Sequence, residues 1–165
     1  MNKLTKEVKN GYVEWLTGIE WSYWCTFTTK YDLSTKSARR LMDRFHARNN
    51  KTINTKMFWV VEQFKNKGGV HVHALLKIED DIPKKAGWDC LFENYQIVSG
   101  SKKVENNNRT KFKTFNRVQF ADYKPDKGVK CAEYCCKYVM KENGKRQSAE
   151  YDIYLSKNFT HGQIR

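Results

Sequence analysis

The chain lacks several features that would assign it to a common class. Its 165 residues contain no apolar run long enough to span a bilayer, and the first residues, Met1 to Lys6, lack the apolar core of a secretory signal. The five cysteines are odd in number and include no Cys-x-x-Cys pair, so we expect neither a disulfide framework nor a structural zinc site. These absences predict reduced thiols in a cytoplasmic protein without a membrane partner.

Acidic residues are also scarce. The sequence has 18 Asp and Glu against 31 Lys and Arg, a formal net charge of +13. Such an excess on a small chain indicates a polyanionic partner, most simply nucleic acid, although a basic protein without such a partner is the alternative. The composition is 39% hydrophobic and 14% aromatic, which excludes a disordered chain and fits one domain over residues 1–165.

The most informative stretch is the apolar, β-branched run from Val70 to Leu76, which carries two histidines one residue apart. Successive side chains of a strand alternate between its faces, so His71 and His73 point the same way. Two neutral imidazoles on one face supply half of a divalent-metal site. The alternative is a strand that happens to carry two surface histidines.

The order of apolar, polar and turn-forming residues predicts alternating helices and strands. Residues 21–29 and 57–64 are rich in aromatic and β-branched side chains, as is typical of strands. Two glycines, Gly68 and Gly69, join the second of these to the histidine strand at 70–78 in a β-hairpin. Further strands are expected at 115–123 and 151–155, helices within 1–20, over 35–49 with Ser34 or Thr35 as N-cap, from 80–83 onward and over 129–142, and a basic loop at 99–114.

A carboxylate completes the candidate metal site. If strand 57–64 pairs with the histidine strand across the glycine turn, Glu62 lies beside His71 or His73. Two imidazoles and one carboxylate would then converge and leave coordination positions open, which suits Mg or Mn acting on a phosphate. The alternative is an ordinary exposed strand carboxylate.

The helix predicted at 129–142 carries two tyrosines and two lysines. Tyr134 and Tyr138 are four residues apart, as are Lys137 and Lys141, so each pair shares one helix surface. A phenolate is a nucleophile toward phosphorus, and a nearby ammonium lowers the cost of the negative charge. The alternative is one core tyrosine and one surface tyrosine.

Two basic regions are candidates for phosphate contact. On the helix 35–49, Arg39, Arg40 and Arg44 surround the apolar positions with little acid to offset them, and Lys102 and Lys103 lie in the basic loop. Exposed tryptophans could stack unpaired bases, although most are expected in the core: Trp21, Trp24, Trp59 and Trp88.

Three short motifs together resemble those of HUH endonucleases, the rolling-circle replication initiators (Rep) of small single-stranded DNA replicons. Phe27-Thr28-Thr29 resembles their first motif and His71-Val72-His73 their second. Tyr134-x-x-Lys137 and Tyr138-x-x-Lys141 resemble their third. The paired tyrosines are most similar to the initiators of microvirus-type bacteriophages.

This resemblance implies an α+β fold with a central antiparallel β-sheet of about five strands flanked by helices. It implies an enzyme that nicks and rejoins single-stranded DNA at a replication origin through a 5′-phosphotyrosine. Glu62, His71 and His73 would hold Mg or Mn, Tyr134 and Tyr138 would be the nucleophiles, and Lys137 and Lys141 would lie near the phosphate. Tyr134 is slightly favoured as the first nucleophile.

One departure from the larger initiators is the lack of a Walker-type glycine-rich loop, so we expect no ATPase activity. Either a host helicase is recruited, together with a polymerase, or the chain is the nuclease portion of a longer Rep. A transposase or relaxase of the same superfamily and a non-catalytic single-strand nucleic-acid-binding domain are the alternatives.

Overall fold

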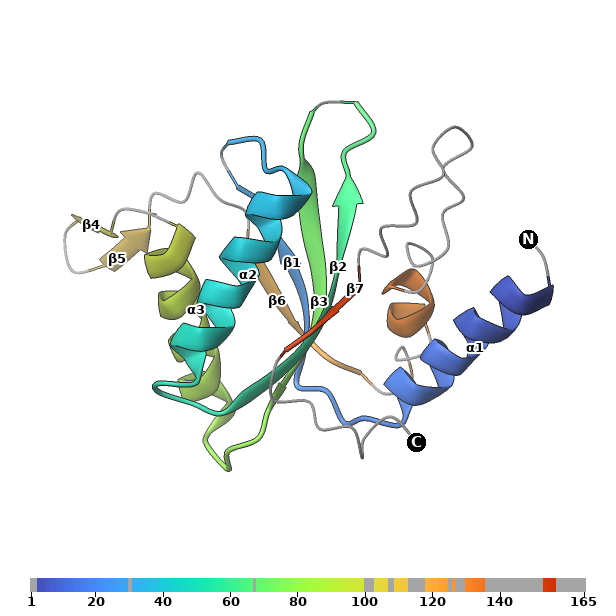
Figure 1. Cartoon of the computed structure of the whole chain (residues 1–165). Coiled ribbons are helices and arrows are strands. Elements are labelled where there is room, and N and C mark those ends of the chain that lie inside the picture. The colour runs from blue at the N-terminus through green and yellow to red at the C-terminus, as the bar shows by residue number, and fades with distance from the viewer. Residues whose placement is uncertain are drawn as a thin grey trace.

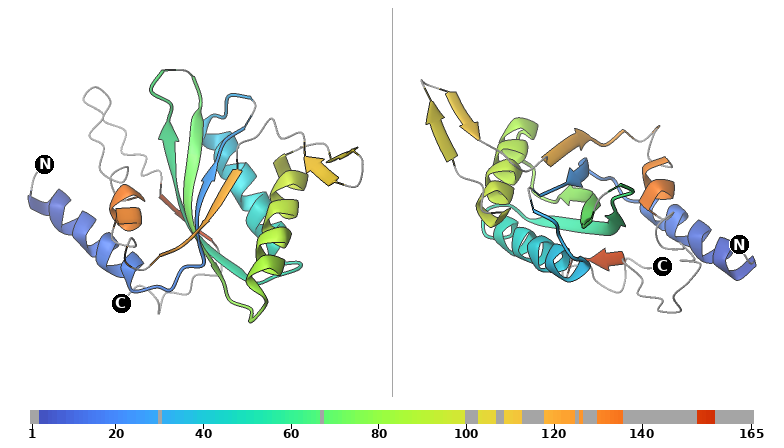
Figure 2. Two further views of the ribbon diagram at one scale, coloured as in Figure 1. Left: turned by 180° about the vertical axis from the view of Figure 1, so that it is seen from behind. Right: turned by 90° about the horizontal axis from the view of Figure 1, so that it is seen from above.

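The computed structural model of the chain contains a five-stranded antiparallel β-sheet in its described part, with strand order β6-β1-β3-β2-β7 (Figure 1). The structure describes residues 3–29, 31–66, 68–99, 103–106, 109–112, 118–124, 126, 130–135 and 153–156. The strands of this sheet are β1 (Tyr23–Phe27), β2 (Thr55–Gln63), β3 (Val70–Ile78), β6 (Val118–Asp122) and β7 (Ile153–Leu155). With helices on both faces of the sheet, this is the predicted α+β fold (Figure 2).

The histidine strand β3 lies at the centre of the sheet and has the predicted bounds. It pairs with β1 along one edge and with β2 along the other. The β2–β3 register places Glu62 opposite His71 and Val60 opposite His73. The hairpin predicted from the two glycines is therefore confirmed, and it brings the carboxylate beside the first histidine.

One face of the sheet is covered by α2 (Thr35–Asn49) and α3 (Lys84–Ser99) (Figures 1 and 2). Helix α2 begins after Ser34, whose hydroxyl accepts a hydrogen bond from the Ser37 N–H, so Ser34 is the N-cap. The side chains of β3 that point away from the histidines pack against this helix. The buried residues of this contact are Ala38, Leu41, Met42 and Phe45 of α2 and Val70, Val72, Ala74 and Leu76 of β3.

The other face, which carries the histidines, packs against α1 (Lys3–Thr17) and a helical turn at residues 130–135 (Figure 1). A second, smaller core joins them to the sheet: Leu16, Trp21, Phe58, Val60, Leu75, Ala132 and Cys135. Because Leu75 shares its face with His71 and His73, the histidines lie at the border of a packed layer. This layer determines how deeply they are buried.

Some predicted elements differ from the structure. The segment expected to be a loop contains β4 (Lys103–Asn106) and β5 (Arg109–Phe112), which pair in a separate two-stranded ribbon, so that prediction was wrong. Helix α3 begins after Pro83, and the acidic pair before it precedes the helix. Of its expected apolar face, Leu91 and Tyr95 are buried, whereas Trp88 is 37% exposed.

Other expectations lie partly outside the described residues. The helix predicted at 129–142 is described over 130–135, and the last strand over 153–155. The described cysteines, Cys25, Cys90, Cys131 and Cys135, are free thiols. Among the described residues, none of the helices has the length and apolar character that crossing a bilayer requires.

The β2–β3 turn depends on one glycine. Gly69 has φ +83°, and a Cβ built on it would lie 3.0 Å from Asp32 Cβ and 3.2 Å from the Leu33 nitrogen. At Gly68 an added Cβ would meet the end of the Asp32 side chain at 3.3 Å, and that side chain can move. The turn therefore tolerates a side chain at Gly68 better than at Gly69.

We expect Gly69→Ala to lower the free energy of unfolding by about 1–2 kcal/mol or more, because a left-handed backbone and a backbone contact both oppose the methyl group. Gly68→Ala is the matched control and should cost clearly less. Urea denaturation of both variants measures the difference. Equal losses would show that the turn does not depend on the conformation of Gly69.

Candidate metal centre and tyrosine

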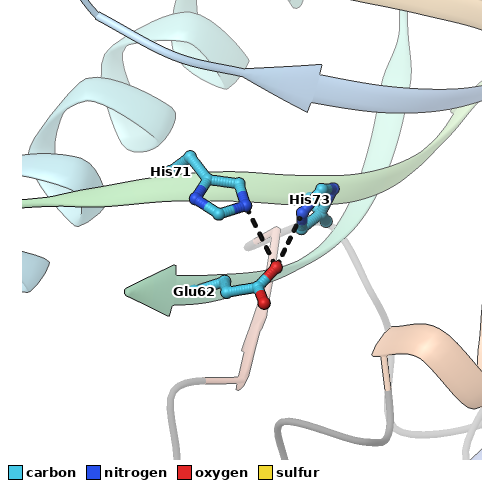
Figure 3. Close-up of side chains that lie close together, drawn as sticks. All are labelled: Glu62, His71 and His73. Carbon is cyan, nitrogen blue, oxygen red and sulfur yellow. Dashed lines mark hydrogen bonds and ion pairs between the residues drawn. The ribbon is translucent and has the colours of Figure 1, made fainter. Parts of the chain in front are cut away.

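Three ligand-type side chains from β2 and β3 converge on one carboxylate oxygen. Glu62 Oε2 lies 3.0 Å from His71 Nε2 and 3.1 Å from His73 Nε2 (Figure 3). One candidate ligand atom from each residue lies within 4.8 Å of the others. The strands explain this convergence, because Glu62 is directly opposite His71 and diagonal to His73 on the same face.

The group is largely withdrawn from water. Glu62 and His73 are each 7% exposed, and His71 is half-buried. Burial lowers the pKa of His73 from 6.5 to about 4; the neighbouring His71 acts in the same direction, whereas Glu62 opposes the shift. His73 is therefore neutral at pH 7 and keeps a nitrogen lone pair that can bind a metal.

Three residues that the sequence analysis did not assign to the site hold the imidazoles in place. The Thr26 hydroxyl lies 3.3 Å from His73 Nδ1, on the ring side opposite the carboxylate. Trp24 stacks on His73 with 5.5 Å between ring centroids, and Phe64 stacks on His71 at 4.6 Å. The alternation Trp24-x-Thr26 along β1 is the signal that could have found the first two, because it places both on the histidine face.

Tyr134 reaches the same carboxylate from a distant part of the chain. Its hydroxyl donates a hydrogen bond of 2.9 Å to Glu62 Oε2, although the two residues are 72 positions apart. Its ring meets His73 edge-on at 4.9 Å and Trp24 edge-on at 5.7 Å. One oxygen of Glu62 thus contacts both imidazoles and the phenol.

These side chains fit a divalent metal ion. Two imidazoles and a carboxylate form a common donor set that leaves several coordination positions open. His71 Nδ1 is buried and has no hydrogen-bond partner among the described residues, so the ring is not fully satisfied by its protein neighbours. A buried carboxylate also gains from a nearby cation. The group Glu62, His71 and His73 can therefore hold a metal ion.

The remaining predicted residues are placed elsewhere or lie outside the described residues. Arg39, Arg40 and Arg44 are exposed on α2, which packs on the sheet face opposite the histidines. Lys103 belongs to β4. The other predicted site residues, Tyr138, Lys137, Lys141 and Lys102, are outside the described residues.

In metal-free protein we expect stability to decrease as the pH falls from about 6.5 towards 4, because the unfolded chain protonates His73 near pH 6.5 and the folded chain only near pH 4. Urea denaturation in EDTA between about pH 5 and 6.5 measures this dependence. His73→Asn, which cannot titrate, should reduce the slope by up to about 1.4 kcal/mol per pH unit. An unchanged slope would contradict the expectation.

Comparison with known proteins identifies the family. A family model described as replication-associated protein ORF2 matches residues 22–143, which is most of the chain. No curated protein and no solved structure matches. The matched residues include Glu62, both histidines and Tyr134. The chain belongs to this family of replication-associated proteins.

Proposed function

We propose that this protein nicks and rejoins single-stranded DNA through a covalent 5′-phosphotyrosine, and that it thereby initiates and terminates rolling-circle replication. The observation that carries the proposal is the 2.9 Å hydrogen bond from Tyr134 to the carboxylate shared by His71 and His73. A nucleophile and a metal-binding group in contact are what phosphodiester transfer requires. Membership of a replication-associated family supports the biological setting.

The proposed metal is Mg²⁺ or Mn²⁺, held by Glu62, His71 and His73. It would supply Lewis-acid polarisation of the scissile phosphate. The protein's own contribution is to orient the donors. Paired strands fix the three backbones, Thr26 and Trp24 hold the His73 ring, and Phe64 holds the His71 ring.

The proposed reaction is a transesterification at phosphorus. The Tyr134 oxygen forms a bond to phosphorus while the bond to the 3′ oxygen breaks, and the phenol proton is balanced by the proton that the 3′ hydroxyl gains. The 5′ phosphate stays on the tyrosine, so the energy of the phosphodiester bond is retained. A free 3′ hydroxyl can later attack the phosphotyrosine, which rejoins the DNA and restores the phenol.

Tyr138 is proposed as a second nucleophile, because it lies one helical turn after Tyr134 in the sequence. Lys137 and Lys141 are proposed to lie near the phosphate and to stabilise its charge. Two tyrosines would let the enzyme alternate nucleophiles between rounds, the arrangement of the microvirus-type initiators. The proposed setting is a replication origin in the host cytoplasm, with host helicase and polymerase as further partners.

The tyrosines are tested with a 3′-labelled, random-sequence single-stranded DNA pool and Mn²⁺, because a random pool contains short recognition sequences of every kind. We expect a labelled protein adduct on a denaturing gel, since the tyrosine keeps the 5′ phosphate of the labelled product. Tyr134→Phe combined with Tyr138→Phe should abolish the adduct. Tyr12→Phe, which changes a tyrosine of α1, should leave it intact. No adduct, or an adduct that survives the double substitution, would end the proposal.

Metal binding is tested separately by titration calorimetry with Mn²⁺. We expect His73→Ala to weaken binding by at least about 100-fold, since supporting partners alone are worth roughly 10- to 100-fold. Thr26→Val should cost about tenfold because it removes the hydroxyl beside His73 Nδ1, whereas Thr26→Ser retains that hydroxyl and should bind normally. Equal affinities for the wild type and His73→Ala would exclude this group as the metal site.

A further inference from the structure

A hollow of about 560 Å³ lies beside α2, on the side of the sheet away from the histidines. Its apolar lining includes Leu33 and Leu41, both almost fully buried. Tyr31, which is 52% exposed, and two arginines of α2 also line it. The volume lies within the range of small-ligand pockets, so the hollow is large enough for one nucleotide.

The arginines give the hollow a positive charge that the protein does not neutralise. Arg40 and Arg44 are four residues apart and lie on one helix face. Both are exposed, and neither forms an ion pair with a residue in the described part of the chain. Asp43 is the acidic lining residue, which leaves two guanidinium groups against one carboxylate. This balance favours an anionic ligand with phosphate groups.

Tyr31 adds a surface for an aromatic ligand. Half of the residue is exposed, so a flat ring can stack on it while the apolar floor of Leu33 and Leu41 excludes water. Aromatic side chains next to arginines are the usual means of binding unpaired bases without sequence preference. A base on Tyr31 with its phosphates on Arg40 and Arg44 uses every one of these features.

The hollow is connected to the start of the histidine strand. The Val70 N–H donates a hydrogen bond of 2.9 Å to the Leu33 carbonyl, and His71 is the next residue. The close approach of Gly69 to Asp32 and Leu33 fixes this contact. Figure 1 shows the β1–α2 connection beside the β2–β3 turn, at the same end of the sheet. The hollow and the metal group therefore lie on opposite faces but at one end of β3.

We propose that this hollow binds an unpaired nucleotide of the substrate DNA, outside the cleavage site, where the strand passes around the β2–β3 turn. The inference rests on the proposed function, because it takes single-stranded DNA as the substrate. It also distinguishes among the basic residues of α2. Arg39 lies 5.3 Å from the Tyr154 ring centroid and does not line the hollow, so Arg40 and Arg44 make the phosphate contacts.

The test measures the affinity of the full chain for a labelled single-stranded DNA of about 20 nucleotides by fluorescence anisotropy. EDTA is present, so neither metal binding nor cleavage contributes. We expect Arg40→Gln combined with Arg44→Gln to weaken binding about tenfold and to reduce the slope of log affinity against log salt by about 1.4, for two lost phosphate contacts. Lys36→Gln combined with Arg39→Gln removes the same charge from the same helix and should change the slope by less than half as much. Equal effects of the two double variants would overturn the proposal.

The aromatic contact is tested in the same assay. Tyr31→Ala should lower affinity about tenfold, because one stacked base is lost, while Tyr31→Phe keeps the ring and should bind as the wild type does. Wild-type affinity in Tyr31→Ala, or an equal loss in Tyr31→Phe, would overturn the stacking contact. Because no metal or tyrosine adduct is needed, a failed nicking assay rejects the catalytic proposal alone, and equal binding by the variants rejects the hollow alone.

Discussion

The contact of one buried carboxylate oxygen with two imidazoles is the constraint on which the site depends. It exists because β2 and β3 pair in a register that sets Glu62 opposite His71. A slip of one residue would send both histidines to the other face of the sheet, into the core beneath α2. The turn at Gly69 and the apolar side chains that alternate with the histidines both oppose such a slip.

The second packed layer converts this contact into a chemically distinct site. The core that α1 and residues 130–135 form with the sheet withdraws His73 from water, and this burial lowers the pKa of His73. The same layer brings Tyr134 to the carboxylate, because Ala132 and Cys135 of that helical turn are fully buried. Desolvation of the donors and placement of the phenol therefore share one structural cause.

The sequence predicted the parts of this arrangement that depend on local patterns. The alternation in the histidine strand, the glycine turn and the Ser34 cap are short-range signals, and each was confirmed. The β4–β5 ribbon was missed because its polar residues show no apolar alternation. The position of the arginines could not be predicted, because helical periodicity shows which side of α2 faces outward but not which face of the sheet α2 covers.

Tyr134 combines two properties that a DNA-cleaving site needs at once. Its hydroxyl contacts the carboxylate, yet 37% of the residue remains exposed, so the phenol borders both the metal group and the solvent. A polymer substrate cannot enter a closed cavity, and a fully exposed tyrosine would not be held against the donors. Rigid strands supply the donors and a helical turn supplies the phenol. The nucleophile can therefore leave Glu62 for a phosphate by movement of its own segment, while the paired strands keep the metal-binding group in place.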